Sequence, residues 1–167
     1  MFENIIKNVH NRHPLIHCIT NYVSINDCAN IVLACGGAPI MAEDINEVSQ
    51  ITSICQGLDI NIGMLNDNKL SSMLKAGATA NELGIPVILD PVGAGSSDYR
   101  IKAVQNLMSN VQFGVIRGNV SEIKAIAAKQ GIHNIAAGVY DTMQKDKSAM
   151  GVEAGIADKI TDDNIKE

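Results

Sequence analysis

An acidic residue that leads into a glycine-rich segment is the feature best suited to chemistry. Asp90 follows the apolar run 87–89, and Gly93 and Gly95 come soon after it among other small residues. A carboxylate at the carboxyl end of a strand holds Mg²⁺ directly or through water, and small residues let backbone amides approach an anion. The alternative is a carboxylate that only caps a turn or the next helix. The segment lacks the lysine of a Walker A loop and the third glycine of the dinucleotide fingerprint, so it is neither motif.

Two further apolar runs end in side chains that could contact a small ligand. Asn21 follows the run 15–20 and offers a donor to a ring nitrogen or a hydroxyl, although Asn is also common in turns. Met41 lies near the end of the run 38–42, where its polarizable thioether could pack against a heteroaromatic ring or fill the core. Both interpretations stay open for each residue at this point.

A cation and a second acid follow the last clear apolar run, at 111–116. The planar fork of Arg117 suits phosphate oxygens better than a lysine would, and a surface ion pair is the alternative. Glu122 and Asp90 follow adjacent strands in the predicted order, so the two carboxylates could hold Mg²⁺ or its water together. Glu122 could instead be an acid that stabilises the start of a helix.

These side chains need an architecture that brings the ends of several strands to one edge. Short apolar runs alternate with segments of helical periodicity. The predicted strands are residues 15–20, 38–42, 58–63, 87–90 and 111–119, and the predicted helices are residues 2–9, 27–34, 44–56, 66–83, 99–108 and 122–129. This order predicts an α/β fold with a mainly parallel, doubly wound sheet flanked by helices. Ligands in such sheets bind at the carboxyl ends of the strands.

Local patterns refine this outline. The apolar run of 87–90 predicts a strand covered on both faces, whereas the alternation of 58–63 predicts a strand near a partly covered edge or a subunit contact. Gly84 is expected at the carboxyl cap of the helix 66–83, and Gly77 should allow that helix to pack closely on the sheet. Ser121 is expected to cap the last predicted helix.

Composition restricts the class of protein. The 167 residues are 46% hydrophobic and 19% charged, which predicts a soluble domain with a substantial core. A net charge of −5, scattered basic residues and 3% aromatic residues argue against nucleic-acid binding. No apolar run has membrane-spanning length and no signal-peptide pattern is present, so we expect no membrane partner and a cytoplasmic protein. The cysteines lack metal-binding spacing and are expected to be buried, reduced thiols: Cys18, Cys28, Cys35 and Cys55.

The carboxyl-terminal residues have the signals of a helix start. Thr161 offers a cap, Asp162 and Asp163 supply an acidic first turn, and the sequence stops within roughly two turns of them. A helix that short has little surface to bury. We therefore expect residues 1–167 to form a single domain that is truncated at its carboxyl end.

Five motifs in this order resemble the hydroxyethylthiazole kinase family: residues 17–21, 38–42, 61–63, 87–95 and 116–119. The resemblance implies a ribokinase-like fold. It also implies ATP as co-substrate and Mg²⁺ as cofactor in the phosphorylation of the primary hydroxyl of 4-methyl-5-(2-hydroxyethyl)thiazole, a step of thiamine salvage. The similarity covers residues 13–128 and returns at 151–154, where Glu153 replaces the usual Asp.

The resemblance assigns roles to residues on the thiazole side. Asn21, Val23 and Met41 correspond to positions of the thiazole site. Gly63 is expected to contribute from a neighbouring subunit, because family members are homotrimers with the alcohol bound between chains.

On the nucleotide side, the resemblance places Arg117 at an ATP-contacting position. Asn119 and Glu122 match the Asn-x-x-Glu element of the superfamily, which helps to hold Mg²⁺ and orders water around the phosphates. Asp90 is expected to hold Mg²⁺ together with Glu122. Asn119 and Arg117 are thus the expected nucleotide-binding residues.

Family members complete the site with a carboxyl-terminal Gly-x-Gly-Cys or Gly-x-Gly-Asp motif, which these 167 residues do not contain. Its glycines would form an anion hole, and its Cys or Asp would act as general base. We therefore assign no catalytic residue and expect the 167-residue chain alone to have little kinase activity. The alternative is a non-catalytic remnant that serves as a binding or oligomerisation module. A sugar or pyrimidine kinase of the superfamily is disfavoured by the motifs around Asn21 and Met41.

Overall fold

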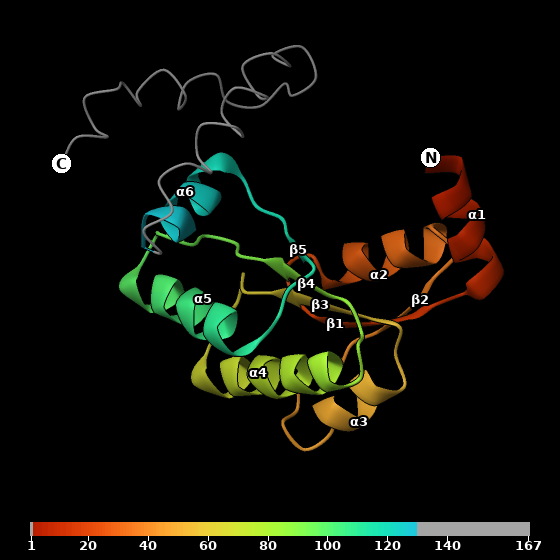
Figure 1. Cartoon of the computed structure of the whole chain (residues 1–167), viewed down its shortest axis with the longest axis horizontal. Coiled ribbons are helices and arrows are strands. Elements are labelled where there is room, and N and C mark those ends of the chain that lie inside the picture. Colours follow the sequence, from red (N-terminus) through yellow and green to blue (C-terminus); the bar gives the residue numbers. More distant parts are fainter. Residues whose placement is uncertain (1, 130–167) are drawn as a thin grey trace, which may run out of the picture.

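Helices and strands alternate along the chain in a computed structural model that describes residues 2–129 (Figure 1). The strands are β1 (Leu15–Ile19), β2 (Ala38–Ile40), β3 (Gly57–Asn61), β4 (Val87–Asp90) and β5 (Val115–Ile116). The helices are α1 (Phe2–Arg12), α2 (Ile25–Ala34), α3 (Val48–Ser53), α4 (Asp67–Glu82), α5 (Asp98–Asn110) and α6 (Val120–Lys129). The motif at 151–154 and the predicted helix start at Thr161 lie outside the described residues.

The strands form one parallel sheet in the order β2-β1-β3-β4-β5. Helices α3, α4 and α5 lie on one side of this sheet, and α1, α2 and α6 lie on the other (Figure 1). The predicted α/β class and the doubly wound parallel sheet are therefore confirmed. The expectation of an edge strand at 58–63 is wrong, because β3 is the middle strand. Its alternation arises because Leu58 and Ile60 face the core while Asp59 faces the more open side.

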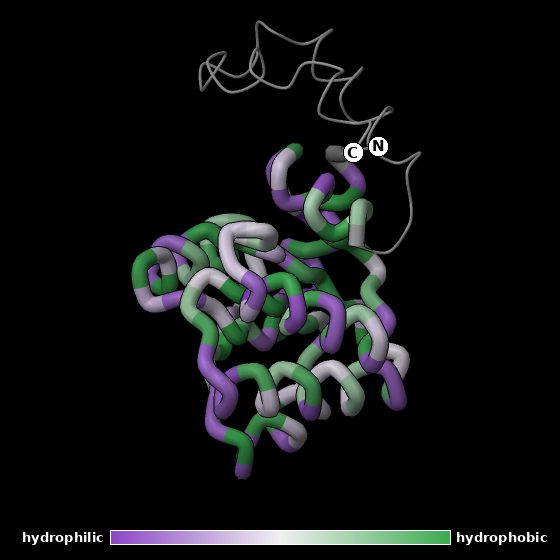
Figure 2. Tube along the Cα trace, turned by 90° about the vertical axis from the view of Figure 1, so that its left-hand side faces the viewer, coloured by the Kyte–Doolittle hydropathy of each residue, from purple (hydrophilic) through white to green (hydrophobic). Residues whose placement is uncertain are grey.

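The core lies between the sheet and α3, α4 and α5. Ile19, Ile60 and Leu89 occupy one row across three strands, and each is 0% exposed. Figure 2 shows hydrophobic and hydrophilic residues alternating along the helices, as expected where one face of each helix meets the sheet. This row gives the strand ends that follow it a rigid base.

The opposite face of the sheet is more open. Ile88 in β4 is 41% exposed, and Val115, its register partner in β5, is 52% exposed. The prediction that the strand 87–90 is covered on both faces is therefore wrong for the residues that the structure describes. An apolar run shows that a strand is hydrophobic on both faces, but it does not show what covers each face.

One glycine within α4 and one just after it behave as local packing requires. Gly84 has a φ of +68°, a left-handed conformation that glycine adopts without strain, which confirms the expected carboxyl cap. A Cβ on Gly77 would lie 2.5 Å from Cγ2 of Val111, the residue that follows α5. Gly77 thus allows close packing, but its near neighbour is Val111 at the end of α5 and not the sheet, as the sequence predicts.

Two elements are shorter than predicted. Helix α3 begins at Val48, because the Asp44 side chain accepts a hydrogen bond from the backbone N–H of Asn46 at 2.8 Å and forms a turn there. Strand β5 has only two residues. Val111 packs against α4 instead of joining the sheet, and hydrogen-bonded pairing with β4 begins at Val115.

The four cysteines carry free thiols. Cys18 and Cys55 are buried as expected, whereas Cys28 is half-buried and Cys35 is exposed. Burial raises the pKa of the Cys18 thiol to about 12, so that thiol stays protonated. Among residues 2–129, no helix combines the length and the apolar character needed to cross a membrane.

Candidate functional site

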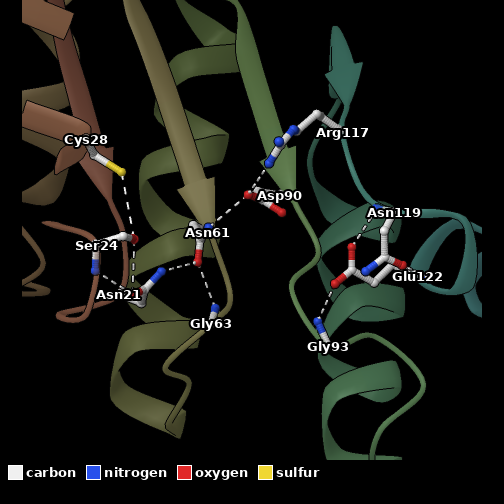
Figure 3. A network of polar contacts seen from close by, with 10 residues as sticks. All are labelled: Asn21, Ser24, Cys28, Asn61, Gly63, Asp90, Gly93, Arg117, Asn119 and Glu122. Carbon is white, nitrogen blue, oxygen red and sulfur yellow. Dashed lines mark hydrogen bonds and ion pairs between the residues drawn. The ribbon is translucent and has the colours of Figure 1, made fainter. Parts of the chain in front are cut away.

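A chain of polar contacts runs along the carboxyl edge of the sheet, one residue from each of four neighbouring strands or strand exits (Figure 3). Asn21 Nδ2 donates to Asn61 Oδ1 at 3.1 Å, and Asn61 Nδ2 donates to Asp90 Oδ2 at 3.0 Å. Arg117 Nη1 lies 3.3 Å from the same Asp90 oxygen. The structure thus joins the residues expected on the thiazole side to those expected on the nucleotide side.

Asn21 shapes the turn after β1. Its Oδ1 accepts hydrogen bonds from the backbone N–H groups of Val23 and Ser24 at 3.1 and 3.0 Å, which is the turn-forming role. Its Nδ2 has one hydrogen bond within the described residues, to Asn61. Because an amide nitrogen carries two hydrogens, one donor remains for a ligand. Val23 is 89% exposed.

Gly63 lies beside Asn21 within the same chain. Its backbone N–H donates to Asn61 Oδ1 at 2.8 Å, and a Cβ there would lie 3.0 Å from Asn21 Nδ2. Glycine at this position therefore leaves room for the side-chain amides of Asn21 and Asn61. Arg100, which sequence reasoning missed, fixes this turn by donating to the carbonyls of Gly63 at 2.8 Å and of Val92 at 2.7 Å.

Met41 lines a cavity of about 230 Å³ beside the polar chain. Asn21, Val23 and Gly63 do not line this cavity in the chain as described. The residues that do are Cys18, Thr20, Tyr22, Ile25, Met41, Ala42 and Glu43. The cavity therefore offers an apolar and sulfur-containing wall together with one carboxylate.

Asp90 is 18% exposed at the centre of the polar chain. Burial raises the pKa of Asp90 and the Glu122 carboxylate adds to this shift, whereas Arg117 and Asn61 oppose it. Burial and the charge of Asp90 also raise the pKa of Asp59 to about 6. Sequence reasoning missed Asp59, whose position on the sheet face toward Asp90 follows only from the strand register.

Glu122 is buried and ties two segments together. Its Oε1 accepts from the backbone N–H of Gly93 at 2.8 Å, and its Oε2 accepts from that of Asn119 at 2.8 Å (Figure 3). Asn119 Oδ1 in turn accepts from the backbone N–H of Glu122 at 3.0 Å, so the two residues form a capping box for α6. The expectation that Ser121 caps this helix is wrong, because it lies inside α6.

The carboxylates at this edge could hold Mg²⁺. No three His, Cys, Asp or Glu residues gather as a metal site among residues 2–129. Mg²⁺ needs only one or two carboxylates, because water and phosphate supply its other ligands. Within the described part of the chain both side-chain contacts of Asp90 use Oδ2, which leaves Oδ1 for the ion or its water. A cation would also relieve the mutual repulsion of Asp59, Asp90 and Glu122.

Arg117 extends from the same edge. Its side chain is 79% exposed, and its Nη1 contacts Asp90, so the surface ion pair is present while the rest of the guanidinium remains open. A guanidinium with free donors at the rim of a sheet can bind phosphate oxygens.

The parallel sheet with polar residues at its carboxyl edge belongs to the α/β class, in which ligands bind at that edge. The model of the hydroxyethylthiazole kinase family matches residues 6–162. The chain belongs to the hydroxyethylthiazole kinase family, and the match extends beyond the motifs at 13–128 that carried the resemblance.

Relatives support this assignment. The chain is 53% identical to the hydroxyethylthiazole kinase of Clostridium acetobutylicum, covering 99% of this chain and 55% of that protein. It is 45% identical to the hydroxyethylthiazole kinase of Desulfovibrio desulfuricans, covering 99% and 53%. The structure of the hydroxyethylthiazole kinase protein from Pyrococcus horikoshii OT3 matches with a TM-score of 0.75 and 39% identity, covering 80% of this chain and 52% of that chain. The chain thus spans about half the length of these relatives.

Proposed function

We propose that this chain provides part of the site for ATP-dependent phosphorylation of the primary hydroxyl of 4-methyl-5-(2-hydroxyethyl)thiazole, in thiamine salvage. The observation that carries the proposal is the unbroken polar chain from Asn21 through Asn61 and Asp90 to Arg117. This polar chain supports the proposal because it puts the residues proposed for the alcohol and those proposed for the phosphates on one sheet edge, and in-line transfer needs both substrates held close together.

On the thiazole side, the Met41 thioether supplies a polarizable surface for the ring. The free N–H of Asn21 donates to the ring nitrogen or the hydroxyl. Val23 and Gly63 complete the site in a homotrimer, in which the alcohol lies between subunits. The 89% exposure of Val23 supports this part of the proposal, since an exposed valine gains cover from a neighbour.

On the nucleotide side, Asp90 and Glu122 hold Mg²⁺ directly or through water, and Arg117 binds phosphate oxygens. Asn119 orders the start of α6 beside them. Bound Mg²⁺ neutralises charge on the phosphates during transfer. We assign no general base to the 167 residues. We predict that the 167-residue chain alone turns over little ATP.

A second candidate function is a non-catalytic module of the same fold that keeps the thiazole pocket and the subunit contacts. The observation that favours it is that the cavity beside Met41 lies within the described residues 2–129. The two candidates differ in one property: the kinase would bind ATP as well as the alcohol, whereas the module would bind the alcohol alone.

Calorimetric titration tests the two candidates. We expect the 167-residue chain to bind the thiazole alcohol, and Met41→Ala to weaken binding about tenfold because the sulfur contact is lost. Coupled binding of the alcohol and Mg-ATP would support the kinase, and alcohol binding alone would support the module. Binding of neither ligand would refute both. ATP turnover equal to that of an intact family member would refute the expected low activity.

A cytoplasmic location is part of the proposal. The four free thiols support it, because a reducing compartment keeps thiols unpaired.

A further inference from the structure

A buried lysine outside the predicted site contacts the wall of the cavity beside Met41. The Lys69 side chain, from the first turn of α4, is 4% exposed. Its Nζ donates to the Thr20 carbonyl oxygen at 2.7 Å and pairs with Glu43 Oε2 at 2.7 Å. The same Nζ lies 4.5 Å from the centroid of the Tyr22 ring, within cation–π range. All three contacted residues line the cavity.

Glu43 completes this cluster. The Tyr22 hydroxyl donates a hydrogen bond to Glu43 Oε1, so both oxygens of the carboxylate are engaged. Burial alone would raise the pKa of Glu43, but the hydrogen bonds from Lys69 and Tyr22 outweigh burial and lower it. Glu43 is therefore a carboxylate at neutral pH and a fixed partner for the ammonium.

The cavity wall consists of two segments that are separate in sequence. Thr20 and Tyr22 follow β1, while Met41 and Glu43 follow β2. Lys69 belongs to neither segment but contacts both of them. One side chain of α4 therefore bridges the two halves of the wall, in addition to the hydrogen bond from Tyr22 to Glu43 that joins them directly.

The ion pair also stands between two cavities. A second cavity, of about 590 Å³, lies on the α4 side and is polar. Glu43 lines both cavities, and Lys69 lines the second. The Lys69–Glu43 pair is therefore shared by the surroundings of both cavities.

We propose that Lys69 is a positioning residue that holds the two halves of the cavity wall at the spacing the thiazole alcohol needs. This inference rests on the proposed function and deepens it. A buried ion pair adds little to stability compared with apolar residues of similar volume. Its effect is therefore expected in the geometry of the cavity.

Lys69→Met tests the inference, because methionine keeps an unbranched side chain without the charge. Lys75→Met is the matched control on the same helix, since Lys75 Nζ donates to the Ile45 carbonyl and does not line the cavity beside Met41. Amide hydrogen exchange, measured without ligand, should rise at least tenfold at residues 20–24 and 41–43 in Lys69→Met. Calorimetric titration with the thiazole alcohol should show at least a tenfold higher Kd. Lys75→Met should change neither measurement.

Three outcomes would overturn the inference. Unchanged exchange at both segments would show that Lys69 does not order the wall. Equal changes in Lys75→Met would show general loosening of α4. A lower melting temperature with an unchanged Kd would show a purely structural role. If Lys69→Met fails to fold, Glu43→Gln, which removes the charge but keeps the shape, is measured in the same way.

The same experiment separates this inference from the proposed function. If the unchanged chain binds no thiazole alcohol, the proposed substrate is refuted. The exchange comparison between Lys69→Met and Lys75→Met still decides, without ligand, whether Lys69 orders the cavity wall.

Discussion

Asp59 illustrates at the residue scale how burial and a neighbouring charge alter a carboxyl group. It lies between Cys18 of β1 and Ile88 of β4 in the register of the sheet. Burial and the neighbouring charge of Asp90 raise its pKa to about 6, from an ordinary value of 3.8. The folded chain therefore binds a proton here more tightly than the unfolded chain does.

The raised pKa of Asp59 should make the free energy of unfolding depend on pH. Because the folded pKa is raised, Asp59 contributes stability that is fully present below pH 3.8 and is lost as the pH rises through about 6. Asp59→Asn should remove this loss and stabilise the fold at pH 7.5 by on the order of 2 kcal/mol. Urea unfolding of both chains at pH 4 and pH 7.5 measures the difference. A gain of equal size at both pH values would contradict the assignment.

His17 shows why residue-scale contacts escape sequence reasoning. It is buried, with Nδ1 2.9 Å from Thr52 Oγ1 and Nε2 2.8 Å from the Ala42 carbonyl oxygen. Burial lowers its pKa, so the ring is neutral and links β1 to α3 and to the end of β2. Neither partner is near His17 in sequence. Lys69 and Arg100 were missed for the same reason.

At the scale of elements, Gly77 controls the distance between α4 and the end of α5. A Cβ at this position would lie 2.5 and 2.8 Å from the two methyl carbons of Val111. Both positions belong to buried parts of the core. The contact therefore permits no larger side chain without movement of one element.

Gly77→Ala should consequently destabilise the protein by about 1–3 kcal/mol through overpacking. Alanine also favours a helix over glycine by about 1 kcal/mol. At the upper end of its range, the loss from overpacking exceeds this gain. The double variant Gly77→Ala/Val111→Ala should recover part of the loss, as a cycle of chemical denaturation experiments would show. Strict additivity of the two substitutions would contradict a direct clash.

The order of helices and strands along the chain was predictable from the sequence. Which faces of the sheet are covered, and where each strand lies in the sheet, were not. Apolar runs at β1 and β4 located the strands and the edge at which Asn21 and Asp90 meet. The alternation in β3 suggested an edge, because a half-buried Asp59 in a central strand looks the same in sequence as a solvent-facing residue. Side-chain periodicity reports which face is apolar, but strand order depends on contacts between distant residues.

At the scale of the whole molecule, α2 has no buried residue among those described. Ile31 and Leu33 are 61% and 57% exposed, although the helix is mostly apolar. Exposed apolar side chains in such numbers are typical of surfaces that contact another protein. This supports the proposed homotrimer, with α2 in or near the contact.

The oligomeric state tests this interpretation. Ile31→Ser/Leu33→Ser should shift a trimer toward smaller species in sedimentation velocity, because it removes apolar area from the contact. Circular dichroism should be unchanged, since exposed substitutions usually alter stability by less than about 0.5 kcal/mol. An unchanged chain that sediments as a monomer would contradict the proposed trimer.

The all-parallel sheet also affects how the protein is made. Among residues 2–129, no strand pairs with its partner through a tight turn; Asn61 and Asp90, for example, are register partners 29 positions apart. Strand β1 pairs with β2 and β3, and β3 is synthesised roughly 40 residues later, which takes about 2–8 s at ribosomal speed. During that delay the side chain of Ile19 has no completed sheet to enter. Burial of Ile19 therefore waits until β3 has been made, so this part of the core forms only after distant segments of the chain come together.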